Sequence, residues 1–344
     1  MAGHGILCRM NEACIGILIV SALLSGCGRE EREVVVYCAL DRHFAEPILK
    51  DYEDQAGVRV RANYDVEANK TVGLFRRLLE ERSNPRCDVF WNNETIHTIL
   101  LKREGILSPY RSPSANGIPA EHKDPEGYWT GFAARARVIV YNSSLIAEQE
   151  SAPQSVLDLA GPAWRGKCAL AKPLFGTTAT HAAILFTLLG RTEAEQFFRR
   201  VRDSEVGILA GNAMVRDRVA AGEYAWGITD TDDVHSGMLD GKPLGMVFPD
   251  QQGFGAILIP NSLSLISGSP HPEEGMRLID FLLDPDVEKR LAAGRSAQIP
   301  LRPGVETPPA FGDLAGIQFA RVDFEQVAEM MDISRDFLRD EFLR

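Results

Sequence analysis

The chain has 344 residues, a formal net charge of −11 at pH 7 and an ordinary share of charged residues, 25%. The acidic balance argues against nucleic acid or an anionic membrane surface as the main partner, because both repel negative charge. The apolar and charged fractions are those of a globular protein, and the length suits two lobes of about 150 residues each.

The amino-terminal segment carries the pattern of a bacterial lipoprotein signal. An apolar run begins near Cys14 and is closed by Leu-Ser-Gly-Cys at residues 24–27. The run is roughly 11 residues long, whereas a helix that crosses a bilayer needs about 20. We therefore expect residues 1–26 to be a signal peptide and residues 27–33 a tether that is lipidated at Cys27. A short transmembrane anchor or a buried helix is the alternative.

The folded part is left with three cysteines, Cys38, Cys87 and Cys168. An odd number leaves at least one thiol unpaired in an oxidising compartment. None of them lies in a Cys-x-x-Cys or other metal spacing, so we expect buried small apolar residues at strand ends. The histidines show no HxH or HExxH pattern, which argues against zinc. The sequence predicts no cofactor and no resident metal.

Strands and helices alternate in the first part of the chain. Strands are expected at 34–38, 58–60 and 87–91, and helices at 44–55, 72–81 and 95–103. Compact apolar runs are typical of strands that are buried on both faces of a parallel sheet. Apolar residues at helical spacing indicate helices with one buried face. The alternation predicts an α/β fold with a mostly parallel sheet.

The pattern changes in the second part of the chain, where longer extended segments appear. Strands are expected at 137–141, 167–171, 224–228 and 255–266, and helices through residue 189, at 193–203 and at 273–283. The tail is expected to form two helices, at 327–331 and 337–343. No internal repeat is present.

Several segments, taken in their order and spacing, are similar to one protein family. They are 88–94 (DVFWNNE), 134–142 (ARARVIVYN), 211–213 (GNA) and 259–261 (IPN), followed by 270–274 (PHPEE) and 279–283 (IDFLL). Together they resemble the extracellular solute-binding proteins of bacterial ABC importers, in the ferric-ion-binding-like branch of the type II fold. The resemblance covers essentially the whole chain after the signal segment.

The resemblance implies two α/β lobes, each a mixed sheet flanked by helices, which close over a ligand about a hinge. Two crossover segments would join the lobes, near Arg135 and near Asn261. We expect lobe 1 to comprise 34–135 and 262–310, and lobe 2 to comprise 136–261 and 311–344.

The resemblance also implies a function without bond making or breaking. A monomer in the periplasm, anchored to a membrane through Cys27, would deliver a small-molecule solute to an ABC permease in the inner membrane. An enzyme is the contrasting class. The chain shows no G-x-S-x-G elbow, no P-loop and no G-x-G-x-x-G after the first strand.

One departure from the family limits what can be carried over. Ferric-binding members have adjacent tyrosines after the strand that corresponds to 225–228, and Thr231 and Asp232 stand at these positions. The acidic ligand that follows the Phe-Trp strand stands here as Asn93, with Glu94 beside it. A ferric ion held by phenolates is therefore not expected. An Fe³⁺ site that uses carboxylates in place of tyrosines stays an alternative.

The candidate ligand-binding residues lie in loops at the carboxyl ends of strands, where ligands of open α/β sheets bind. They are Asp41, Asn92, Asn93, Phe175, Gly176, Thr177, Thr178, Asn212, Ala213, Thr229, Asp230, Thr231 and Asp232.

These residues offer partners for both signs of charge. Thr177, Thr178 and Asn212 lie at helix starts, which suit a carboxylate, phosphate or phosphonate. Asp230 and Asp232 suit an ammonium, a guanidinium or a metal, with helix capping as an equal alternative. Capping is the favoured role for Asp41 and for Asp233. The sequence thus predicts a small polar solute, zwitterionic or phosphorus-containing.

Two further readings stay open from the residues alone. Arg135 and Arg137 share one face of a strand, so one of them can reach an anion in the cleft, although salt bridges are an equal alternative. Aromatic residues near the strand ends, such as Trp91 and Phe254, leave room for a lipid or sterol carrier on the same fold.

Overall fold

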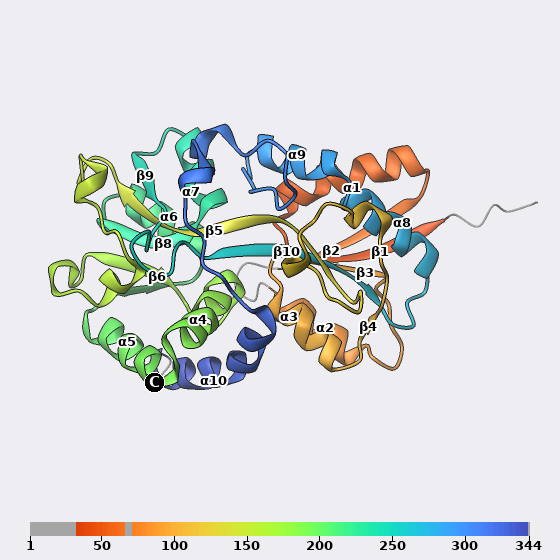
Figure 1. Ribbon diagram of the computed structural model, residues 1–344, viewed down its shortest axis with the longest axis horizontal. Coiled ribbons are helices and arrows are strands. Elements are labelled where there is room, and N and C mark those ends of the chain that lie inside the picture. Colours follow the sequence, from red (N-terminus) through yellow and green to blue (C-terminus); the bar gives the residue numbers. More distant parts are fainter. Residues whose placement is uncertain (1–31, 66–70, 343–344) are drawn as a thin grey trace, which may run out of the picture. The chain divides into compact units, whose positions relative to one another are not determined.

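Ten strands are connected into one mixed sheet in the computed structural model, which describes residues 32–65 and 71–342 (Figure 1). The strands are β1 (Glu33–Cys38), β2 (Arg59–Tyr64), β3 (Val89–Asn92), β4 (Leu107–Ser108), β5 (Thr130–Asn142), β6 (Cys168–Ala171), β7 (Gly207–Leu209), β8 (Trp226–Asp230), β9 (Leu244–Val247) and β10 (Leu258–Ile266). The predicted signal peptide, with Cys27, lies outside the described residues.

Helices cover the strands and connect many of them. They are α1 (Arg42–Ala56), α2 (Val72–Glu80), α3 (Ile96–Arg103), α4 (Gly176–Leu189), α5 (Arg191–Asp203), α6 (Asn212–Ala220), α7 (Thr231–Leu239), α8 (Pro272–Leu282), α9 (Pro285–Ala293) and α10 (Phe324–Phe342). Across residues 32–65 and 71–342, no helix has both the length and the apolar character to cross a membrane.

Strand β5 belongs to two groups of strands. Its first half pairs antiparallel with β10, and residues from Arg137 onward pair antiparallel with β8 and β9. The strand order is β2-β1-β3-β10-β5 on one side and β5-β8-β6-β7 on the other. The predicted α/β architecture is therefore confirmed, and the predicted crossovers at Arg135 and Asn261 fall within β5 and β10 and stay a prediction. The exact limits of the two lobes stay a prediction.

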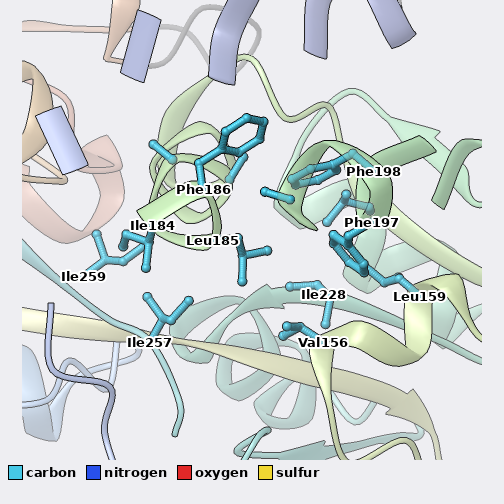
Figure 2. Close-up of a cluster of buried hydrophobic side chains, with 14 of the residues drawn as sticks. Val156, Leu159, Ile184, Leu185, Phe186, Phe197, Phe198, Ile228, Ile257 and Ile259 are labelled. Atoms are coloured by element: carbon cyan, nitrogen blue, oxygen red, sulfur yellow. The ribbon is translucent and has the colours of Figure 1, made fainter. Parts of the chain in front are cut away.

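The largest apolar cluster lies among α4, α5, α10 and the inner strands (Figure 2). Helix α4 is apolar on all sides between Ala182 and Phe186, and such a helix is stable only when it is covered all round. Phe186 stacks on Phe198 of α5 with ring centroids 6.0 Å apart. Ile228 of β8 lies in the same cluster. This packing fixes the position of α4, whose first turn reaches the site described below.

The carboxyl-terminal segment corrects one prediction. Instead of two helices at 327–331 and 337–343, a single helix, α10, runs from Phe324 to Phe342. The residues between the two expected helices contain no proline or glycine to end a helix. Val327, Met331 and Leu338 are buried, and α10 packs against α4, α3 and α5. Packing on both sides therefore stabilises the helical conformation of the polar residues in the middle.

The three cysteines of the described part are buried and form no disulfide, and the sequence predicts their burial. Burial raises the pKa of Cys168 to about 12, so that thiol stays protonated and unreactive at neutral pH.

Candidate functional site

A cavity of about 340 Å³ lies where the carboxyl ends of β1, β3, β6, β7 and β8 meet the starts of α4, α6 and α7. Most of the predicted ligand-binding residues line it: Asp41, Asn93, Phe175, Gly176, Thr177, Thr178, Asn212, Ala213, Asp230 and Asp232. The structure thus brings together loops that are far apart in the sequence. Whether each residue contacts a ligand stays a prediction.

Three predicted residues do not line the cavity, and their side chains bond to neighbouring parts of the chain instead. The amide of Asn92 donates to Glu94 Oε1 at 2.7 Å. The hydroxyl of Thr229 donates to Asp233 Oδ2 at 2.9 Å, and that of Thr231 accepts from the backbone N–H of Ala136 at 3.2 Å. These contacts shape the loops around the cavity.

Arg137 is fully buried and forms a tight ion pair behind the cavity. Its Nη1 donates to Asp230 Oδ1 at 2.7 Å. The other carboxylate oxygen of Asp230 accepts from Thr177 Oγ1 at 2.6 Å and from Asn212 Nδ2 at 3.0 Å. The charge of Asp230 is therefore satisfied within the protein by residues of β5, α4 and α6.

The electrostatics of this pair follow from its surroundings. Burial opposes ionisation of Asp230, but the charges of Arg137 and Arg135 outweigh it and lower the pKa of that carboxyl. Burial, and then the charge of Arg137, lowers the pKa of His181 well below its ordinary value. The imidazole of His181 is therefore neutral, and its Nδ1 accepts from Arg137 Nε at 3.3 Å.

Arg135 is held much more loosely than Arg137, although it is only 2% exposed. Its Nη2 donates to the carbonyl of Asn93, its Nη1 lies 4.0 Å from Asp232 Oδ2, and its Nε has no partner among the described residues. A buried guanidinium with an unused donor is costly unless something else pairs with it. Arg135 lines the cavity, so an anionic ligand can supply that partner.

Asp232, like Arg135, is a buried charged residue that lines the cavity without a close ion-pair partner. Burial raises the pKa of Asp232 well above its ordinary value, in spite of the charge of Arg135. The nearby charges of Asp233, Asp230 and Asp41 raise the pKa further. Asp232 thus lines the cavity as a buried carboxyl whose nearest described cation lies beyond hydrogen-bond distance.

Two helix starts face the same cavity. Gly176–Leu189 and Asn212–Ala220 are helices, which confirms that the Gly-Thr-Thr and Gly-Asn-Ala segments open them. Neither start has a side-chain capping hydrogen bond. Their first backbone N–H groups carry the positive end of the helix dipole, which favours an anion. Asp41 likewise stands at the N-cap position of α1 without a side-chain capping bond, so its predicted capping role is not observed.

Glu94 is excluded as a cavity ligand by its contacts. It is fully buried and accepts from the backbone N–H groups of Ile96 and His97 at 2.6 and 3.0 Å, which caps α3. It also accepts from Thr180 Oγ1 at 3.0 Å. No tyrosine is among the described residues that line the cavity, so phenolate ligands are missing from it.

Sequence reasoning missed three polar residues of the cavity, Lys172, Arg216 and Ser236. Lys172 directly follows β6, so the strand-end rule that selected the other loops would have found it. Its side chain is half-buried and has no hydrogen-bond or ion-pair partner among the described residues. Arg216 and Ser236 lie inside helices, and their approach to the cavity depends on helix packing that no local pattern reveals.

Acidic side chains also cluster closely enough to hold a cation. Oxygen atoms of Asp230, Asp232 and Asp233 lie within 4.8 Å of one another. Carboxylates at this density suit a hard metal ion or an organic cation equally. The pairing of Asp230 with Arg137 leaves a positive charge beside the cluster, which opposes a highly charged metal ion.

Comparison with known proteins gives a consistent result. The chain is 26% identical to a putative 2-aminoethylphosphonate-binding periplasmic protein of Salmonella typhi over 95% of this chain and 98% of that protein. Its fold matches iron-bound HitA from Pseudomonas aeruginosa with a TM-score of 0.82 and 22% identity, covering 90% of this chain and 99% of HitA. It also matches AfuA from Actinobacillus pleuropneumoniae with bound fructose-6-phosphate, with a TM-score of 0.80 and 21% identity over 91% and 99% of the two chains.

The structural matches confirm the fold predicted from the sequence. Residues 98–329 match the family described as bacterial extracellular solute-binding protein. Because this match spans more than half of the chain, the chain belongs to the family of bacterial extracellular solute-binding proteins.

Proposed function

We propose that the chain is the periplasmic binding component of an ABC importer, anchored by a lipid on Cys27. Its solute would carry both an anionic phosphorus group and an amine. One observation carries the proposal: two uncapped helix starts and two loosely held cations surround a cavity that also contains Asp232, a buried carboxyl whose nearest described cation is 4.0 Å away. Relatives named for periplasmic Fe³⁺ and 2-aminoethylphosphonate binding support the general role.

The anionic group would bind between the starts of α4 and α6 and the side chains of Arg135 and Lys172. The hydroxyl of Thr177 and the amide of Asn212 are already bonded to Asp230. The backbone N–H groups of these helix starts, more than those side chains, are therefore free to meet the ligand. Several convergent donors and two cations suit a tetrahedral phosphonate or phosphate better than a planar carboxylate.

The amine would bind at Asp232, with Asp41 close by. The sequence predicts that both carboxylates bind the cationic end of the solute. Asp230 already has an arginine partner, so we assign the binding of the amine to Asp232. An ammonium group of the solute would replace the missing cation and stabilise the charged form of Asp232. This pairing explains why a carboxyl that is costly to ionise lines the cavity at all.

A ferric ion bound by carboxylates is the second candidate function. The close spacing of Asp230, Asp232 and Asp233 favours it. The cations that surround these carboxylates oppose it, because Arg135 and Arg137 lie beside two of them.

The ligand is tested with the chain in which Cys27→Ser removes the proposed lipid site. Native mass spectrometry identifies any co-purified solute, and calorimetry then compares 2-aminoethylphosphonate with three probes. These are ethylphosphonate, which lacks the amine, β-alanine, which replaces the phosphonate by a carboxylate, and Fe³⁺. We expect 2-aminoethylphosphonate to bind more tightly than either truncated analogue. Tight binding of Fe³⁺ with no response to the phosphonates would replace the proposal by the metal-binding alternative.

The lipid anchor is tested separately in cells. Palmitate labelling is expected for the unsubstituted protein, and Cys27→Ser should abolish the label and release the protein from the membrane fraction. A protein that stays in the membrane without the cysteine would indicate an uncleaved apolar anchor.

Lys172→Met is expected to weaken binding of an anionic solute by about tenfold at low ionic strength, because a half-buried cation contributes through attraction that salt partly screens. The loss of affinity should become smaller as salt is added. Calorimetry at two salt concentrations checks both statements. Lys289→Met, on the exposed face of α9, is the control and should bind as the unsubstituted protein does. An equal loss in both variants would show that long-range charge, not contact, is responsible.

A further inference from the structure

The strand that carries Arg135 contains a β-bulge two residues earlier. Phe132 pairs with Asn261 and Ala134 pairs with Pro260, so Ala133 is an extra residue without a partner on β10. Ala133 has a φ of 40°, in the left-handed region that favours glycine. A bulge of this kind bends its strand and redirects the side chains that follow.

Buried polar groups hold this unusual backbone in place. Glu288, which is fully buried on α9, accepts from the backbone N–H of Ala133 at 2.8 Å and from that of Leu301 at 3.0 Å. The amide of Asn261 donates to the carbonyl of Ala133 and to Gln298 Oε1 at 2.7 Å. Both polar groups of Ala133 are thus bonded to side chains instead of to a neighbouring strand.

Glu288 does not line the cavity, and it forms a buried ion pair with Arg302. Its nearest described cation is Arg302, whose Nε lies 3.5 Å from Glu288 Oε2, and neither atom has a hydrogen-bond partner. A buried carboxylate is costly to maintain. Its contact with the N–H of Ala133 gives it a role, because the N–H of a bulge residue would otherwise be buried without an acceptor.

The bulge bends the backbone that carries Arg135. The guanidinium has no ion pair within hydrogen-bond distance and keeps one unused donor, and a hydrogen bond from its Nη2 to the carbonyl of Asn93 holds it. With so few contacts of its own, the side chain takes its direction in part from the preceding backbone. We propose that Glu288 is a positioning residue: it holds Ala133 in the left-handed conformation and so directs Arg135 into the cavity. The inference rests on the proposed function only in taking Arg135 as a ligand contact.

The test is a double-substitution cycle with Glu288→Met and Ala133→Gly in the full chain. Methionine has a similar length but cannot accept the N–H of Ala133, whereas glutamine would keep an oxygen that can. Glycine adopts the left-handed conformation without the side-chain clash, so it should make the hold of Glu288 unnecessary. We expect Glu288→Met to weaken binding of 2-aminoethylphosphonate by about fivefold, and Ala133→Gly to restore it to within about twofold. Thermal unfolding of the same four proteins should show coupling of the same sign without any ligand.

The control is Asp88→Asn, which perturbs another fully buried carboxylate that accepts two backbone N–H groups, those of Val35 and His271, at the opposite end of β3. It should lower stability and leave affinity unchanged. Additive effects of the two substitutions, in affinity and in unfolding, would overturn the positioning role. If the unsubstituted protein binds no phosphonate while the unfolding cycle still shows coupling, the proposed function fails and the hold on Ala133 stands.

Discussion

Arg137→Met is expected to lower the free energy of unfolding by about 3–5 kcal/mol at neutral pH, because Asp230 would keep a buried charge without its partner. Methionine fills much of the space of the arginine stem, so loss of packing contributes little. The hydrogen bonds from Thr177 and Asn212 to Asp230 remain, but they do not supply a positive charge. Chemical denaturation of both proteins at pH 7 measures the difference.

The pH dependence of this loss has a definite sign. In the unsubstituted protein the pKa of Asp230 is lowered, so its stabilising contribution is present above the ordinary carboxyl pKa and is lost as the pH falls through the folded value. Without Arg137, burial would raise that pKa and the folded protein would take up a proton. The difference between the two proteins in free energy of unfolding should therefore decrease as the pH falls toward about 4.

A second substitution separates charge from packing in this result. Asp230→Asn, added to Arg137→Met, removes the uncompensated carboxylate and should recover much of the lost stability. A double variant as unstable as Arg137→Met would show that the space filled by Arg137, and not the pairing of charges, determines the stability of this region.

Asp232→Asn is expected to weaken binding of an amine-bearing solute by about 1–3 kcal/mol, because an amide cannot replace the charge that meets the ammonium group. The same substitution should make the ligand-free protein more stable at neutral pH. The folded protein binds the proton of Asp232 more tightly than the unfolded chain does, since burial raises its pKa. Stability is therefore lost as the pH rises from the ordinary carboxyl pKa toward the folded value, and asparagine removes that loss.

Calorimetry checks the expected loss of affinity, and thermal unfolding between acid and neutral pH checks the expected gain in stability. Asp240→Asn is a matched control, because Asp240 follows the same helix, α7, at its far end and pairs with Arg295 at the surface. It should leave affinity unchanged. Should Asp232→Asn lower both affinity and stability, Asp232 would be a structural residue of the first turn of α7 and the amine would need another partner.

The general position of the site could be predicted from the sequence, and the physical reason is simple. The parallel strands β1 and β3 end at one edge, and so do the parallel strands β6 and β8. The two pairs run in opposite directions along β5, so the loops after all four strands gather beside the middle of β5. Loops that follow a strand and open a helix are recognisable from residues such as Gly176 and Gly211. Most of the loop residues selected from the sequence therefore line one cavity.

The different roles of the two carboxylates within the site could not be predicted from the sequence. Asp230 ends β8 and Asp232 lies two residues later in the first turn of α7, yet Asp230 is paired with Arg137 and Asp232 has no cation within hydrogen-bond distance. That difference depends on which arginine of β5 approaches each carboxylate, which is a matter of tertiary distance. The bulge at Ala133 could not be predicted either, because a residue with positive φ in a bulge is usually glycine and this one is alanine.

The position of Arg135 and Arg137 on β5 has a mechanical consequence. β5 is shared by both groups of strands and lies beside β10 (Figure 1). If the proposed lobes rotate about β5 and β10, charges on that axis keep their separation at every angle. A solute bound at Arg135 would then keep that contact throughout, whereas its contacts with Asp41 and with the start of α6 would change with the angle. In the proposed function, capture and closure would therefore be successive events, and the contacts that change with the angle would decide whether a captured solute is retained.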